Sequence, residues 1–103
     1  MIRVSVLYPS EPGKKFDWDY YITKHIVMVH EKLDPLGLVR SEVDRAVSAE
    51  EAGATPFVGV AHLYFNSVAD FQNGFGAHGG DFMADMPNYT DIVPQIQISE
   101  IIR

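Results

Sequence analysis

The fold of this chain is decided by one stretch, Asp17-Trp-Asp-Tyr-Tyr-Ile-Thr-Lys-His-Ile-Val-Met-Val-His-Glu-Lys-Leu33. Its apolar residues recur every three or four positions, which is typical of an amphipathic helix. Asp17 is a suitable N-cap, because its carboxylate can accept a hydrogen bond from an amide of the first turn. Pro35 and Gly37 mark the helix end. At about 100° per residue, the predicted apolar stripe consists of Trp18, Ile22, His25, Val29 and Leu33.

His25 lies in the middle of this stripe, and an ionisable ring on a buried face has two explanations. In the first, His25 is a neutral core histidine that is hydrogen-bonded to a backbone group or a tyrosine. In the second, it is a pocket histidine that contacts a ligand or moves a proton. The pattern favours neither. Tyr21, one turn earlier, either orients His25, donates a hydrogen bond to a substrate oxygen, or packs at the rim.

The composition indicates one globular domain over residues 1–103, of which 47% are hydrophobic. Eight basic and fourteen acidic residues give a net charge of −6 without a basic stripe. This argues against nucleic acid and against membranes as partners. The absence of cysteine excludes disulfides, zinc–thiolate sites and thiol nucleophiles. No apolar run approaches the roughly 20 residues that span a bilayer, and no signal peptide is recognisable, so we expect a cytoplasmic protein.

The segments around the helix predict four strands and a second helix. Alternating or continuous apolar residues indicate strands at 2–8, 38–47, 57–65 and 92–102. The charged face of 38–47 indicates either an edge strand or a strand with one solvated face. A helix is expected to begin at Ser67 and to end near Phe75. The four glycines at 74, 76, 79 and 80 then predict a separate helical piece from about Gly80 to Met86. The small, acidic segment 48–55 is expected to be a mobile loop.

The order strand, helix, strand, strand, helix, strand predicts a ferredoxin-like βαββαβ fold of the α+β class. Its antiparallel four-stranded sheet carries both helices on one face. Several apolar side chains remain on the other face, and two sheets that pack face to face in a homodimer would cover them.

Three segments in order resemble the EthD family: Phe16-Asp-Trp-Asp-Tyr-Tyr-Ile-Thr-Lys-His25, Gly-Phe-Gly-Ala-His at 74–78, and Met86-Pro-Asn-Tyr-Thr-Asp91 with its Gln97-Ile-Ser-Glu100 tail. The resemblance covers essentially the whole chain. It implies a dimeric α+β barrel and a link to degradation of ethyl tert-butyl ether, in which a cytochrome P450 system takes part. The wider superfamily includes isomerases, polyketide cyclases, cofactor-free monooxygenases and haem proteins, so the fold does not identify the reaction.

His25 matches the Lys-His of the family's helix motif, and in relatives that helix face closes a pocket between helices and sheet. We therefore predict His25 and Tyr21 as catalytic residues, with His25 as general base or acid. His62 on a strand and His78 among the glycines are candidates for the same pocket, with structural or surface roles as the alternative. The predicted substrate-binding residues are Trp18, Ile22, Val29, His62, His78 and Tyr89.

We expect neither a metal nor a cofactor, because the chain has no His-x-His, His-Glu-x-x-His or glycine-rich phosphate motif. Haem bound through one histidine is an alternative by superfamily analogy alone. The leading interpretation is a protein that binds, or binds and transforms, a small, mostly apolar organic molecule in a catabolic pathway. One alternative is a cofactor-independent isomerase, cyclase or monooxygenase in which His25 transfers the proton. The other is a non-catalytic accessory or structural homodimer.

Overall fold

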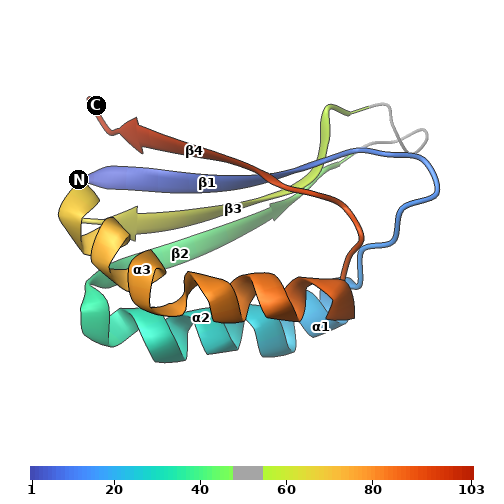
Figure 1. The fold of residues 1–103 in the computed structure, drawn as a ribbon. Helices are drawn as coiled ribbons and strands as arrows, with labels where there is room; N and C mark the ends of the chain where they lie inside the picture. Colours follow the sequence, from blue (N-terminus) through green and yellow to red (C-terminus); the bar gives the residue numbers. More distant parts are fainter. Residues whose placement is uncertain (48–54) are drawn as a thin grey trace.

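The computed structural model describes residues 1–47 and 55–103, and within them the four strands form an antiparallel sheet of order β2-β3-β1-β4. The strands are β1 (Ile2–Pro9), β2 (Leu38–Arg45), β3 (Phe57–Phe65) and β4 (Gln95–Glu100). The long helices cover one face of the sheet, and no described helix covers the other (Figure 1). This confirms the ferredoxin-like α+β arrangement, with β2 at an edge, one of the two predicted alternatives. The loop expected at 48–55 lies, except for Thr55, outside the described residues.

The first helical region begins and ends where the sequence predicts, but it is not one regular helix. It consists of α1 (Trp18–Tyr20), a π-helical turn η1 (Tyr21–His25), α2 (Ile26–Leu33) and a 3-10 turn η2 (Asp34–Leu36). Asp17 caps it by accepting a hydrogen bond from the Tyr20 N–H at 3.0 Å. Gly37 ends it with a φ of +104°, a left-handed conformation that favours glycine.

The π-helical turn changes which side chains face the sheet. The Ile26 N–H donates to the Tyr21 carbonyl, five residues back rather than four. The wider turn shifts the helical phase, so Tyr21 is buried whereas Ile22 is 47% exposed. The predicted stripe is therefore wrong at Ile22, and Tyr21 takes its place.

The second long helix, α3 (Val68–Asp85), is followed by a 3-10 turn η3 (Met86–Asn88). Ser67 caps α3 by accepting from the Asp70 N–H at 3.2 Å, as predicted. The predicted break near Phe75 is wrong, because the helix continues through all four glycines. Gly74 allows close helix packing, since a Cβ there would lie 2.9 Å from Leu33 Cδ2. The solvent-facing glycines lower helix stability by only about 1 kcal/mol each relative to alanine.

The core lies between the helices and the inner face of the sheet. The register places Val4 beside Leu63 and Val6 beside Ala61 on this face. One cluster packs Val4 and Leu63 against Leu33 and Phe82. A second cluster, rich in tyrosine, packs around Ala61 at the other end of the sheet; it contains Tyr8, Tyr21, Tyr89 and Ile92. In the described ranges, no helix has the length and apolar character needed to cross a membrane.

Candidate functional site

A cavity of about 260 Å³ lies between the sheet and the helices. Its lining is almost entirely apolar and comes from β1, β3 and β4, from α2 and α3, and from the segment before β4. Three lining residues, Met83, Val93 and Ile96, are 70%, 76% and 55% exposed, so the cavity opens between α3 and β4. An apolar cavity of this size and shape suits a small organic molecule.

The polar side chains of the wall are buried and lie against one another. They are the tyrosines Tyr8, Tyr21 and Tyr89, together with His25, which is 5% exposed. The Tyr21 and His25 rings are stacked at 5.4 Å with an angle of 15° between their planes. Tyr89 is held beside the helix start, because its carbonyl accepts the Asp17 N–H at 2.7 Å. The cavity therefore has an apolar body and one polar end.

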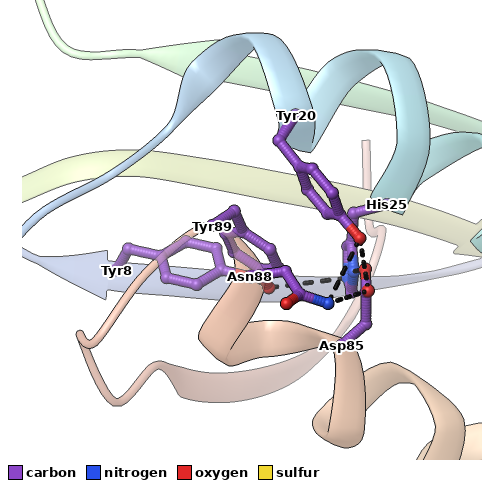
Figure 2. Close-up of polar contacts among 6 residues, drawn as sticks. All are labelled: Tyr8, Tyr20, His25, Asp85, Asn88 and Tyr89. Atoms are coloured by element: carbon purple, nitrogen blue, oxygen red, sulfur yellow. Dashed lines mark hydrogen bonds and ion pairs between the residues drawn. The ribbon is translucent and has the colours of Figure 1, made fainter.

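His25 connects this polar end to an acidic residue outside the lining. Its Nδ1 lies 2.9 Å from Asp85 Oδ2, at the end of α3. Its Nε2 lies 3.5 Å from the Tyr89 hydroxyl, which in turn lies 2.8 Å from the Tyr8 hydroxyl. Figure 2 shows these side chains converging from β1 (Tyr8), from the first helical region (His25), from the end of α3 (Asp85) and from the segment after η3 (Tyr89). The arrangement is a carboxylate, an imidazole and two phenols in series.

Two further side chains hold the other oxygen of Asp85. The Tyr20 hydroxyl donates to Oδ1 at 2.7 Å, and the Asn88 amide donates to the same oxygen at 3.0 Å. Asp85 therefore has hydrogen-bonding partners on both oxygens.

Burial and hydrogen bonding determine the protonation states of His25 and Asp85. Burial lowers the pKa of the His25 ring below its ordinary value, although the Asp85 carboxylate acts in the opposite direction. Burial acts to raise the pKa of the Asp85 carboxyl, but the hydrogen bonds from Tyr20, Asn88 and His25 outweigh it, and the net direction is downward. An ionised Asp85 only accepts hydrogen bonds, so a neutral His25 carries its proton on Nδ1. Nε2 is then the basic nitrogen at the cavity.

The tyrosine hydroxyls at the polar end stay protonated. Burial raises the pKa of Tyr8, Tyr21 and Tyr89, which keeps them as hydrogen-bond donors. The strong acceptor of this cluster is His25 Nε2, which lies 3.5 Å from the Tyr89 hydroxyl. A ligand oxygen or an acidic ligand proton would find complementary partners here.

The structure brings four of the predicted residues to the cavity, namely His25, Tyr21, Val29 and Tyr89. Trp18 is not among the lining residues. Its ring lies over Gly59 of β3, where an added Cβ would overlap it, and it packs against Phe16 with ring centroids 4.4 Å apart. Trp18 therefore fills the space between the helix start and the sheet.

Ile22, His62 and His78 also lie outside the cavity wall, which corrects the predicted site. Ile22 is turned to solvent by the π-helical turn. His62 alternates with the inward residues of β3, so it lies on the open face of the sheet, where its Nε2 is 2.8 Å from Asp44 Oδ2. His78 lies near Asp81, with Nδ1 3.8 Å from its Oδ2, and neighbouring Gly79 lines the cavity instead.

Sequence reasoning missed the partners of His25. Asp85, Tyr20 and Asn88 are absent from the predicted site. Tyr8 could have been found, because it follows Val4 and Val6 at a spacing of two and therefore shares their core-facing side of the strand. Within the described ranges, no three His, Asp or Glu side chains are grouped to hold a metal ion.

The fold and the site define a ferredoxin-like α+β protein with an apolar cavity whose polar end is a histidine, tyrosines and a supporting carboxylate. No family model and no curated protein matches the sequence. An EthD-like protein from Ralstonia eutropha JMP134 is 34% identical, with a TM-score of 0.88 over 99% of this chain and 92% of that chain. This chain belongs to the EthD-like family.

More distant structures share the fold alone. An EthD family protein from Bacillus halodurans C-125 is 20% identical, with a TM-score of 0.65 and 99% of each chain covered. A hydroxynitrile lyase from Passiflora edulis is 18% identical, with a TM-score of 0.61 over 96% of this chain and 93% of that chain.

Proposed function

We propose that this protein binds a small, mostly apolar organic molecule in the cavity and that His25 exchanges a proton with it, as in a cofactor-independent isomerase, cyclase or monooxygenase. The observation that carries the proposal is the Asp85–His25 pair, 2.9 Å apart, at the polar end of an otherwise apolar cavity. A degradative pathway that includes a cytochrome P450 is the setting implied by the family resemblance, and it belongs to this proposal.

The chemistry follows from the roles of four groups, namely the His25 ring, the Asp85 carboxylate and the hydroxyls of Tyr8 and Tyr89. The neutral His25 Nε2 accepts a proton from the ligand, and a base whose pKa lies near the working pH does this efficiently. Asp85 fixes the Nδ1–H tautomer and stabilises the imidazolium that forms. The hydroxyls of Tyr8 and Tyr89 donate to a ligand oxygen on which negative charge develops. The matching ligand has an apolar body and one acidic C–H or O–H next to an oxygen.

A non-catalytic binding protein is the second candidate function. It is favoured by the contact between the His25 Nε2 and the Tyr89 hydroxyl, because the polar end then satisfies its own hydrogen bonds without a substrate. The two candidates differ in turnover alone, so a proton-transfer assay separates them.

Homodimerisation through the open face of the sheet is part of the proposal. The apolar side chains of Leu7 and Val60 on this face are only half-buried in the single chain. The Nε of Arg3 is buried and has no hydrogen-bond partner among the described residues. A second sheet packed against this face would cover the apolar groups and supply polar partners.

The base-sensitive probe 5-nitrobenzisoxazole tests proton transfer. A base that removes its ring C–H proton breaks the N–O bond and releases a coloured cyanophenolate, so absorbance reports each turnover. The wild-type protein should release the product faster than the His25→Gln variant, and Asp85→Asn should lie between them. The rate should rise with pH through a midpoint below 6.5, because burial lowers the pKa of the His25 ring.

His78→Gln is the matched control, since His78 lies outside the cavity, and it should keep the wild-type rate. Binding of the probe is measured in parallel by calorimetry. Binding without any rate above that of His25→Gln would contradict proton transfer and favour the binding protein. Failure to bind at millimolar concentration would contradict the cavity as the ligand site.

A further inference from the structure

The two oxygens of Asp85 have different partners. Oδ2 faces His25 Nδ1, at 2.9 Å. Oδ1 accepts from the Tyr20 hydroxyl at 2.7 Å and from the Asn88 amide at 3.0 Å. The Asn88 amide also lies 3.3 Å from the Tyr20 hydroxyl, so Tyr20, Asn88 and Oδ1 form a closed triangle. Figure 2 shows the Tyr20 hydroxyl and the Asn88 amide pointing toward the Asp85 carboxylate, beside the His25 ring.

The π-helical turn explains how Tyr20 reaches the same carboxylate as His25. The two residues are five positions apart, and in a regular α-helix such residues point in directions that differ by about 140°. Across η1 the backbone hydrogen bond runs between residues five apart, from the Ile26 N–H to the Tyr21 carbonyl. Residues at this separation are therefore nearly aligned along the helix axis, and both side chains meet Asp85. Such turns recur at functional sites.

The 3-10 turn η3 positions Asn88, the third member of the triangle. Asn88 follows Asp85 by three residues, and Pro87 within this turn restricts the backbone between them. Both Asp85 and Asn88 line an open groove between α2 and α3. The Asp85 side chain is nevertheless only 17% exposed. Tyr20 and Asn88 thus occupy the side from which water would otherwise solvate Oδ1.

We infer that Tyr20 and Asn88 are positioning residues for the site: they hold Asp85 with Oδ2 on His25 Nδ1, and thereby keep the tautomer whose Nε2 faces the cavity. Neither residue touches the cavity or a ligand in it. Without them, the carboxylate rotates into the groove and Nδ1 loses its fixed acceptor. The effect on turnover rests on the proposed function, whereas the effect on the His25 tautomer does not.

The test uses Tyr20→Phe, Asn88→Ala and the double variant. The first readout is the pair of ¹⁵N chemical shifts of the His25 ring, which report the tautomer directly, followed through a pH titration. The wild-type protein should show a single Nδ1–H tautomer, and the double variant should show a mixture with a shifted titration midpoint. The second readout is turnover of 5-nitrobenzisoxazole, in which kcat should fall about tenfold, the equivalent of one lost hydrogen bond, while KM changes by less than about twofold.

Tyr64→Phe is the matched control. The Tyr64 hydroxyl also donates to a carboxylate, Glu42 Oε1 at 2.7 Å, but on the open face of the sheet. The Tyr64→Phe substitution therefore removes the same kind of hydrogen bond, and it should leave the His25 spectrum and kcat unchanged.

A double variant with the wild-type tautomer and titration midpoint would overturn the inference. If the double variant shows a mixed tautomer but the wild-type protein does not turn over the probe, the positioning role is supported and the proposed function is contradicted. If the double variant does not fold, Tyr20→Phe alone supplies the same comparison, because it removes a single hydroxyl.

Discussion

His25 Nδ1 and Asp85 Oδ2 lie 2.9 Å apart although the two residues are 60 positions apart in the chain. The contact joins the π-helical turn to the end of α3, so it couples the packing of the two helices to the state of the site. Both groups are largely removed from water, with side-chain exposures of 7% and 17%. A buried pair of this kind makes stability depend on pH.

The protein should lose stability as the pH falls below 6.5. The pKa of the His25 ring is lowered from 6.5 by burial, so the unfolded chain takes up this proton before the native protein does. Because the unfolded state binds more protons, acid favours it. The pKa of Asp85 is lowered from 3.8 by its hydrogen-bond donors, which adds a second loss of stability below that pH. Urea unfolding at pH 7.5 and pH 5 measures the loss of stability that we attribute to His25.

His25→Gln is the control for this prediction, since glutamine keeps hydrogen bonding but does not titrate. Its free energy of unfolding should change less between the two pH values than that of the wild-type protein. An equal change in both proteins would assign the pH dependence to other groups.

Local patterns were sufficient to predict the strands, the sheet and part of the site. Alternation identifies the inward face of β1, and helical spacing brings His25 and Val29 to the core. The exchange of Ile22 for Tyr21 was not predictable, because a π-helical turn is a departure from the spacing on which the prediction depends. Asp85 was not predictable as the partner of His25, since that contact depends on which turn of α3 packs against the first helix.

The glycines of α3 should differ sharply in their response to alanine. Gly74→Ala should destabilise the protein by about 1–3 kcal/mol, because the new Cβ would lie 2.9 Å from Leu33 Cδ2 in a packed interface. Gly76→Ala and Gly80→Ala should each stabilise it by about 0.5–1 kcal/mol, since nothing lies within 4 Å of either Cβ position and alanine favours the helix. Melting temperatures of the three variants test this. Stabilisation by all three would contradict the close contact at Gly74.

The proposed homodimer should depend on the open face of the sheet. Val60→Glu places a charge on that face and should convert the dimer to a monomer of about 11.5 kDa, the mass of one chain. Val27→Glu is the control, because Val27 is 46% exposed on the helical side and its replacement should leave the dimer intact. An interface of the obligate class buries more than roughly 2,000 Å² in total. Sedimentation at micromolar concentration measures both variants, and a monomeric wild-type protein would contradict the dimer.

A larger side chain in the cavity should weaken ligand binding without destabilising the fold. Ala61 lines the cavity and is 3% exposed, so Ala61→Leu extends a larger apolar side chain into the empty space beside it. Because the new side chain replaces void, stability should be kept within about 1 kcal/mol or increase. Binding of 5-nitrobenzisoxazole should weaken at least about tenfold, since the probe and the side chain compete for one volume. Val60→Leu on the opposite face enlarges the adjacent residue without entering the cavity and should bind like the wild-type protein. Unchanged binding by a folded Ala61→Leu variant would show that the probe occupies another surface.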